Sequence, residues 1–200
     1  METKLKDILA ISRRLKRIAA LTWWVQSLYP EEEDRPVLVG AAALELHTEG
    51  AYLTADLDFV GTLPSVVTGK LKEAGFVQLD RQWLYEEESV SFVFRGEALR
   101  AGERAVEKGV ENYSVLIISP EDLLVDRLAT WRRMRSPTHG VQAYLLYYVT
   151  HAAIDAEHLR RRAVQEDVVP ALDSVIRLFF QIKGQIPDAE YLGIWASRGM

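Results

Sequence analysis

The stretch VLVGAAALELHTEGAYLTADLDFV, residues 37–60, decides the fold. It opens with a short apolar run, residues 37–39, which stops at Gly40 and is followed by three alanines and a Leu-Glu-Leu segment. Alanine and leucine favour a helix, and Gly50 is a suitable residue to end it. Residues 56–60 then show the alternation of apolar and polar residues that is typical of a strand. The stretch therefore predicts a strand, a helix that begins at a glycine, and a second strand.

Two aspartates occupy alternate positions of the second strand. Because residues i and i+2 of a strand point to the same face, Asp56 and Asp58 should present two carboxylates side by side, while Leu57 and Phe59 face the core. Two like charges so close repel each other unless a cation or a shared proton relieves them. Mg²⁺ is the usual cation where phosphates are bound. A pair of solvated aspartates at the end of a hairpin is the alternative, and both interpretations stay open.

The start of the predicted helix suits a phosphate group. Gly40 and Ala41 carry little or no side chain, so a ligand can approach the backbone closely. The free N–H groups at a helix N-terminus favour an anion. A phosphate site at this turn makes a metal at the two aspartates the more attractive interpretation.

The sequence Val39, Gly40, Ala41, followed by a helix and by TADLDF at residues 54–59, resembles the nucleotidyltransferase superfamily, the fold of DNA polymerase beta and kanamycin nucleotidyltransferase. The Thr-x-Asp-Leu-Asp-Phe form is most similar to the abortive-infection nucleotidyltransferases of bacterial toxin–antitoxin systems and their uncharacterised relatives. A looser similarity extends through residues 83–102 and 119–131. The resemblance implies a nucleotidyltransferase-like fold.

The same resemblance implies a set of site residues and partners. Asp56 and Asp58 would be the catalytic residues and the ligands of Mg²⁺, while Gly40, Ala41 and Thr54 would bind a nucleoside triphosphate. The nucleotidyl group would pass to a hydroxyl of unknown origin, on RNA, on a protein or on a small molecule. A toxin–antitoxin or defence setting, with an antitoxin as protein partner, is a further expectation.

The resemblance also implies a third carboxylate on a neighbouring strand, as a further ligand for two-metal transfer. The matching strand, residues 90–94, offers Ser91 and Val93, and the pattern of the similar proteins would place the acid at Val93. Glu97 and Glu88, at the two ends of this strand, are the nearest substitutes, or else ordinary surface residues. This departure supports an alternative function, a catalytically degenerate binding module with the same fold (a pseudoenzyme).

Residues 119–129, SPEDLLVDRLA, predict the start of another helix. Ser119 suits the N-cap, Pro120 the first helical position and the two acids the first turn. In the similar toxin-like proteins a basic residue of this helix often faces the nucleotide phosphates, and the resemblance carries that role to Arg127. The basic end of the helix, residues 132–135, either complements the helix dipole or neutralises a triphosphate.

Apolar periodicity predicts the remaining elements. We expect one long helix over residues 4–28, a helix at 65–74, short strands at 76–79 and 82–85, a charged connection at 102–109, a buried strand at 113–118 and a helix at 121–135. Helices at 141–151, 155–165, 169–183 and 189–196 should form a bundle. The predicted division is a core with its N-terminal helix at 1–135 and a C-terminal helical bundle packed on it at 136–200, with a single domain made of both parts as the alternative.

Composition limits the class of protein. The 200 residues are 48% hydrophobic with a net charge of −5 and no cysteine, which suits a globular core, excludes thiol catalysis and favours a reducing, cytoplasmic setting. No apolar run has the roughly 18 residues of a membrane-spanning helix, so we expect no membrane association. The histidines have no metal-ligand spacing. The sequence predicts an α+β fold: a nucleotidyltransferase-like mixed sheet flanked by helices, with a C-terminal helical part.

Overall fold

The structure, a computed structural model, describes residues 2–51, 56–88 and 90–199. The chain divides into two compact units, Met1–Ile118 and Ser119–Met200. We expected the helical part to begin at residue 136, whereas the division falls 17 residues earlier (136 − 119), immediately before helix α5 (Pro120–Met134). Helix α5 packs on other helices of the C-terminal unit, which explains its place there.

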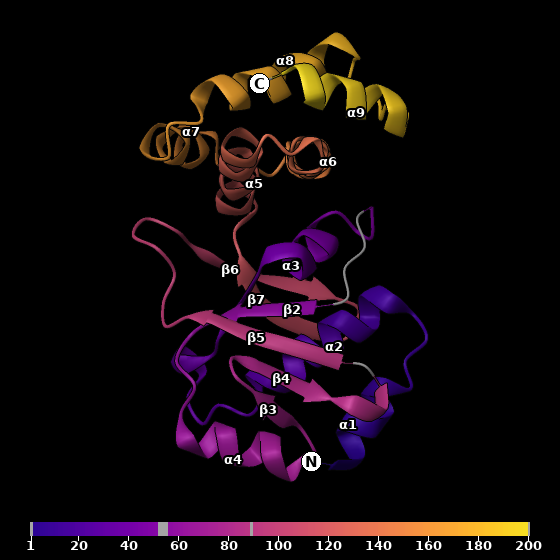
Figure 1. The fold of residues 1–200 in the computed structure, drawn as a ribbon, viewed down its shortest axis with the longest axis vertical. Helices are drawn as coiled ribbons and strands as arrows, with labels where there is room; N and C mark the ends of the chain where they lie inside the picture. Colours follow the sequence, from indigo (N-terminus) through magenta and orange to yellow (C-terminus); the bar gives the residue numbers. More distant parts are fainter. Residues whose placement is uncertain (1, 52–55, 89, 200) are drawn as a thin grey trace. The chain divides into compact units, whose positions relative to one another are not determined.

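A mixed sheet forms the centre of the N-terminal unit (Figure 1). The strand order is β3-β4-β5-β2-β1-β7-β6. The strands are β1 (Val37–Val39), β2 (Asp56–Val60), β3 (Val77–Leu79), β4 (Gln82–Tyr85), β5 (Val90–Gly96), β6 (Ala105–Val110) and β7 (Tyr113–Ile118). The pairs β1–β7 and β2–β5 are parallel, and the other neighbouring pairs are antiparallel. The mixed sheet and its helices confirm the predicted α+β class.

Helices flank this sheet. They are α1 (Glu2–Leu9), α2 (Arg14–Gln26), α3 (Gly40–His47) and α4 (Ser65–Glu73), with the short 3-10 turns η1 (Glu32–Asp34) and η2 (Glu86–Glu88). Helix α2 packs on β7, and α3 packs on β1 and β2. The buried Gln26 side chain fixes α2 to the sheet, because it donates to the carbonyl of Pro36 and exchanges two hydrogen bonds with the backbone of Leu116. The core beneath contains Phe59 and Phe92 edge to face.

Two predictions for the N-terminal unit were wrong. The helix expected over residues 4–28 is broken between Leu9 and Arg14, because positions 12 and 13 carry Ser12 and Arg13 where the apolar stripe should continue. The charged connection expected at 102–109 contains strand β6, which forms an antiparallel hairpin with β7. Since β6 lies at the edge of the sheet, its charged residues can face water and hide the strand pattern.

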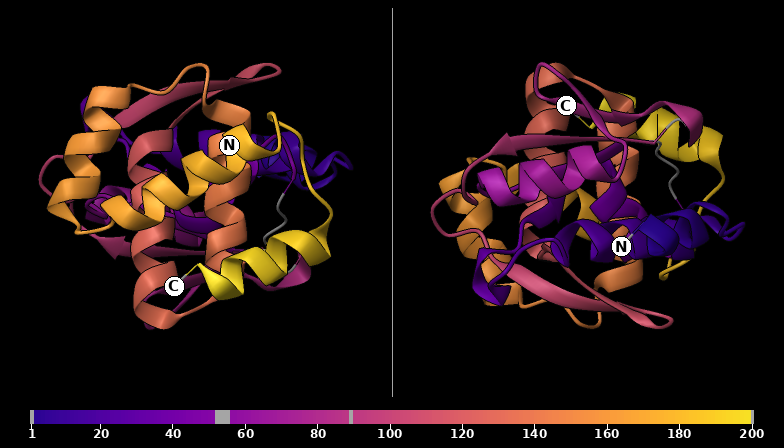
Figure 2. Two further views of the ribbon diagram at one scale, coloured as in Figure 1. Left: turned by 90° about the horizontal axis from the view of Figure 1, so that it is seen from above. Right: turned by 90° about the horizontal axis from the view of Figure 1, so that it is seen from below.

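The C-terminal unit is helical. After α5 it contains α6 (Pro137–Thr150), α7 (Ala156–Gln165), α8 (Val169–Gln181) and α9 (Ala189–Arg198). Helices α5 and α6 lie side by side, and α7, α8 and α9 cover one side of this pair (Figures 1 and 2). The predicted C-terminal helical part is confirmed. Within the described residues, no helix is both long and apolar enough to cross a membrane.

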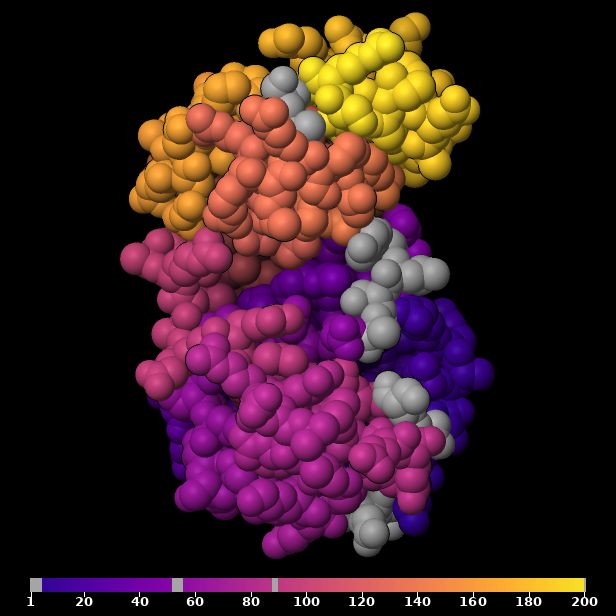
Figure 3. Space-filling model, in the orientation of Figure 1, coloured from indigo at the N-terminus to yellow at the C-terminus, as the bar shows by residue number. Residues whose placement is uncertain are grey.

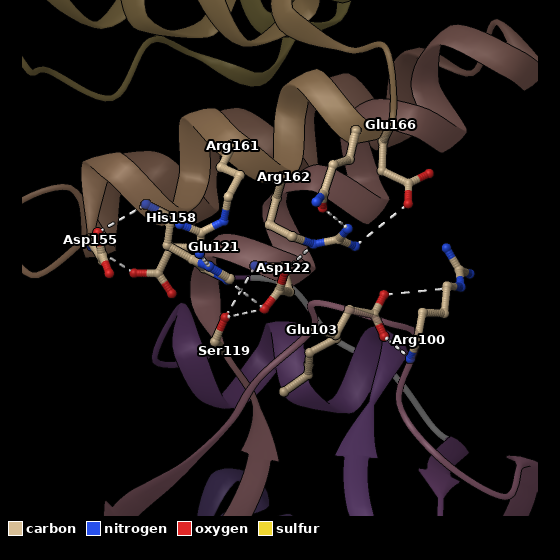
Figure 4. A network of polar contacts seen from close by, with 12 residues as sticks. Arg100, Glu103, Ser119, Glu121, Asp122, Asp155, His158, Arg161, Arg162 and Glu166 are labelled. Atoms are coloured by element: carbon tan, nitrogen blue, oxygen red, sulfur yellow. Dashed lines mark hydrogen bonds and ion pairs between the residues drawn. The ribbon is translucent and has the colours of Figure 1, made fainter.

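A buried polar network joins the start of α5 to α7 (Figure 4). The Oδ2 atom of Asp122 accepts hydrogen bonds from Ser119 Oγ and His158 Nε2, both at 2.9 Å, and its Oδ1 atom accepts one from Arg162 Nε at 2.8 Å. The Asp122, His158 and Arg162 side chains are at most 3% exposed. Ser119 is also the N-cap of α5, as predicted, so one buried carboxylate connects the cap to another helix.

Candidate functional site

The glycine that starts α3 lies directly against one of the two aspartates. Strands β1 and β2 are paired so that Val39 is opposite Asp58. Gly40 has a φ of +69°, and a Cβ atom added to it would lie 2.8 Å from Asp58 Oδ2. A side chain at residue 40 would therefore collide with this carboxylate. The structure thus brings together the N-terminus of α3 and strand β2, the two elements of the predicted site.

The alternation in β2 places the side chains as expected. Leu57 and Phe59 are buried at 3% and 0% exposure, whereas Asp56 is exposed and Asp58 is half-buried on the other face. Each carboxylate has a partner on the neighbouring strand β5. Asp56 Oδ1 accepts a hydrogen bond of 2.6 Å from Ser91 Oγ. Asp58 Oδ1 forms an ion pair of 2.8 Å with Arg95 Nε.

No third carboxylate completes a metal cluster in the described part of the chain. In the parallel pairing of β2 with β5, Ser91 is opposite Asp56 and Val93 is opposite Asp58, so the strand presents a hydroxyl and an isopropyl group beside the acids. Glu97 follows the end of β5 and forms no metal cluster with the two acids. Two carboxylates beside a helix N-terminus fit one Mg²⁺ ion bound together with phosphates, since Mg²⁺ sites commonly use one or two carboxylates. They do not form a closed metal site made of protein ligands alone.

A pocket of about 640 Å³ lies at the ends of β2 and β5, and Gly40, Asp56 and Asp58 are not among its lining residues. It is lined by residues 61–64 after β2, by Arg81, and by residues 94–97 at the end of β5. Arg95 lines the pocket and also pairs with Asp58, so it connects the two features. The pocket lining combines the apolar Phe94 with two arginines and the carboxylate of Glu97.

The other predicted site residues are placed differently. Ala41 is half-buried in the first turn of α3, next to Gly40, and Thr54 lies outside the described residues. Arg127 lies in α5 of the C-terminal unit, where it contacts Asp126 at 3.0 Å and Gln142 at 3.4 Å. Its side chain is only 12% exposed. The structure therefore groups Gly40 and the aspartates, while Arg127 belongs to the other compact unit.

Arg127 has a second neighbour, His139, which was not among the predicted site residues. Burial lowers the pKa of His139, and the positive charge of Arg127 lowers the pKa of this histidine further. Both Arg127 Nε and His139 Nδ1 are buried without a hydrogen-bond partner in the described part of the molecule. The arginine is thus held in a setting with unused hydrogen-bonding groups.

The contacts of the aspartates with Ser91 and Arg95 were not predicted from the sequence. Ser91 lies on the strand expected to carry a third acid, and the predicted strand ends at residue 94, one residue before Arg95. Extending the alternation by one step would have placed residues 91, 93 and 95 on the same face as the aspartates. The pairing with β2, however, is not visible in the sequence.

Comparison with known proteins supports the fold. No protein-family model and no curated protein matches the sequence. Among solved structures, the chain is similar to the crystal structure of an antigenic nucleotidyltransferase-like protein from Paracoccidioides brasiliensis. The TM-score is 0.53 with 15% identity, and the match covers 92% of this chain and 96% of that one. The fold is nucleotidyltransferase-like, as the Gly40 to Asp58 stretch predicted, and the toxin–antitoxin subtype stays a prediction.

Proposed function

We propose that this protein is a nucleotidyltransferase, which transfers a nucleotidyl group from a nucleoside triphosphate to a hydroxyl acceptor with the help of Mg²⁺. One observation supports this most directly: the carboxylate of Asp58 lies against Gly40 at the N-terminus of α3. A helix N-terminus favours phosphate oxygens, and a pair of carboxylates favours a hard divalent cation. The two halves of a metal–triphosphate complex therefore have adjacent binding groups on β2 and α3.

In this proposal each residue has a defined task. The backbone N–H groups at Gly40 and Ala41 hold phosphate oxygens, and Asp56 and Asp58 hold Mg²⁺. When bound, the metal neutralises charge on the phosphates and so lowers the barrier to attack. The acceptor oxygen forms a bond to the α-phosphorus, the bond to the β-bridging oxygen breaks, pyrophosphate leaves, and the hydroxyl proton passes to water. The resemblance adds Arg127 and Thr54 to the proposed nucleotide-binding residues.

The aspartates provide the test. In a thermal-shift experiment with Mg²⁺ and a non-hydrolysable triphosphate at about 100 times its dissociation constant, binding should add about 2.7 kcal/mol to stability. We expect Asp56→Asn combined with Asp58→Asn to abolish this shift and the transfer of label from an α-labelled triphosphate. The double variant Asp34→Asn with Asp80→Asn removes the same charge and should retain both. An unchanged shift in the first variant would show that the aspartates are not metal ligands.

A catalytically degenerate binding module is the second candidate, and the partners of the aspartates favour it. Asp58 is paired with Arg95, Asp56 is bonded to Ser91, and Val93 occupies the position where a third acid was sought. A protein cation on the carboxylate competes with a metal. Binding of the triphosphate without transfer of label would identify this function.

The competition between Arg95 and Mg²⁺ can be measured. The Arg95 side chain is 60% exposed, so its ion pair with Asp58 is worth at most about 1 kcal/mol. We expect Arg95→Gln to tighten Mg²⁺ binding in the presence of the triphosphate, by up to about fivefold, as measured by calorimetry. Arg13→Gln, which removes another exposed ion pair in the same unit, is the control. Weaker Mg²⁺ binding in Arg95→Gln would mean that the arginine supports the bound complex instead of competing with it.

A toxin–antitoxin or defence setting, with an antitoxin as protein partner, belongs to the same proposal. Its support is the Thr-x-Asp-Leu-Asp-Phe segment at residues 54–59. If it is correct, expression of the chain should arrest bacterial growth, and the variant Asp56→Asn with Asp58→Asn should not. Equal growth with both chains would contradict this setting.

A further inference from the structure

The last two helices of the chain form a groove that the proposed function does not use. It has a volume of about 370 Å³, within the usual range of small-molecule sites. Its lining comes entirely from residues 174–199, on and beside α8 and α9. In the space-filling view, α9 forms part of the outer surface (yellow in Figure 3). The side chains that matter for the argument are Arg177, Gln181, Tyr191, Ile194, Trp195 and Arg198.

The groove is positively charged. None of its lining residues is acidic, and within the described parts of the chain neither Arg177 nor Arg198 has an ion-pair partner. By contrast Arg132 and Arg160, which are also exposed on this unit, each pair with an aspartate, at 2.6 and 2.5 Å. Two unpaired guanidinium groups on one groove can bind a phosphate with charge-assisted hydrogen bonds.

The same groove has an aromatic and apolar wall. Tyr191 is 48% exposed and Ile194 is 46% exposed, so both side chains are available to pack against a ligand. Trp195 is half-buried, and its ring is 5.1 Å from that of Trp131, whose indole N–H donates to the carbonyl of Ala196. These two contacts hold the Trp195 ring in place. An exposed ring beside a cationic group is a common arrangement for stacking a nucleobase.

We propose that the α8–α9 groove binds a nucleoside monophosphate, with its phosphate on Arg177 and Arg198 and its base against Tyr191 and Ile194. A planar ring and an anion joined by a short linker match the two halves of the groove, and the Gln181 amide can bond to a base edge or a sugar hydroxyl. The groove has no carboxylate, so binding needs no divalent metal. This separates it from the aspartate site, where Mg²⁺ accompanies the triphosphate.

Calorimetry with the four 5′-mononucleotides in EDTA tests the proposal on the full chain. At least one of them should bind to the wild type, and Arg177→Gln and Arg198→Gln should each weaken that binding about tenfold, which corresponds to one strong charged contact. Arg133→Gln removes the same charge from α5, outside the groove, and should bind like the wild type. Tyr191→Leu should weaken binding of the mononucleotide but not of inorganic phosphate.

Two results would overturn the proposal: no mononucleotide binds in EDTA, or the double variant Arg177→Gln with Arg198→Gln binds as tightly as the wild type while its circular-dichroism melting curve is unchanged. The variant Asp56→Asn with Asp58→Asn distinguishes the two sites. It should keep metal-free mononucleotide binding and lose the Mg²⁺-dependent triphosphate shift. Loss of metal-free binding in this variant would place the nucleotide at the aspartates and contradict the groove.

Discussion

Asp122→Ala should destabilise the C-terminal unit by about 3–5 kcal/mol, the usual cost of removing one partner from a buried ion pair. The Asp122 carboxylate is fully buried and accepts hydrogen bonds from Ser119, His158 and Arg162. Without it, the Arg162 guanidinium, which is 3% exposed, loses its 2.8 Å ion pair and keeps the longer one with Glu166, at 3.5 Å. Urea unfolding followed by circular dichroism measures the loss, with the two compact units treated as separate transitions if two appear.

Asp173→Ala is the matched control for this prediction. Asp173 pairs with Arg160 at 2.5 Å, but both side chains are about half exposed, at 44% and 53%. A solvent-exposed pair is worth about 0–1 kcal/mol, so the control should change stability little. If the two variants were equally stable, burial of the Asp122 network would not be the source of its contribution.

Gly40→Ala should have the second large effect, on stability and on the candidate site together. Alanine at a φ of +69° costs about 1–2 kcal/mol, and the new Cβ would lie 2.8 Å from Asp58 Oδ2. The carboxylate must move away, so we expect a total loss of about 2 kcal/mol or more and at least tenfold weaker Mg²⁺-dependent triphosphate binding. Thermal unfolding and calorimetry measure the two effects.

Gly69→Ala is the control for Gly40. Gly69 lies within α4, and a Cβ atom there would meet nothing within 4 Å. Because alanine favours a helix more than glycine does, this variant should gain about 0.5–1 kcal/mol. A Gly40→Ala protein that unfolds and binds like the wild type would show that the close approach of α3 to Asp58 is unimportant.

The sequence predicted those features that depend on neighbouring residues. The alternation of Asp56 and Asp58 with buried Leu57 and Phe59 is local, and so is the N-cap at Ser119, and both are present in the structure. Strand β6 was not predicted because it lies at the edge of the sheet, where charged side chains can face water and obscure the alternation of apolar and polar residues. The break between α1 and α2 was not predicted, because apolar residues recur at three- and four-residue steps on both sides of it.

The environment of the aspartates could not be predicted, since it depends on pairing between distant segments. Ser91 and Arg95 reach Asp56 and Asp58 through the parallel pairing of β2 and β5, which are more than thirty residues apart. No pattern within either segment predicts which residues of β2 and β5 are paired. The absence of an acid at Val93 was visible in the sequence, whereas the arginine that pairs with Asp58 became visible only in the folded chain.

Strand β7 is the last strand of the sheet to be synthesised, yet it lies inside the sheet, between β1 and β6. Until residues 113–118 are made, β1 has no partner on the side that β7 will occupy, although β2 to β5 are complete once residue 96 has been made. An open strand edge is a place where two nascent chains can pair wrongly. Because β1 waits for a strand more than seventy residues later in the chain, the rate of chain elongation sets how long this edge is open to chaperones or to other nascent chains.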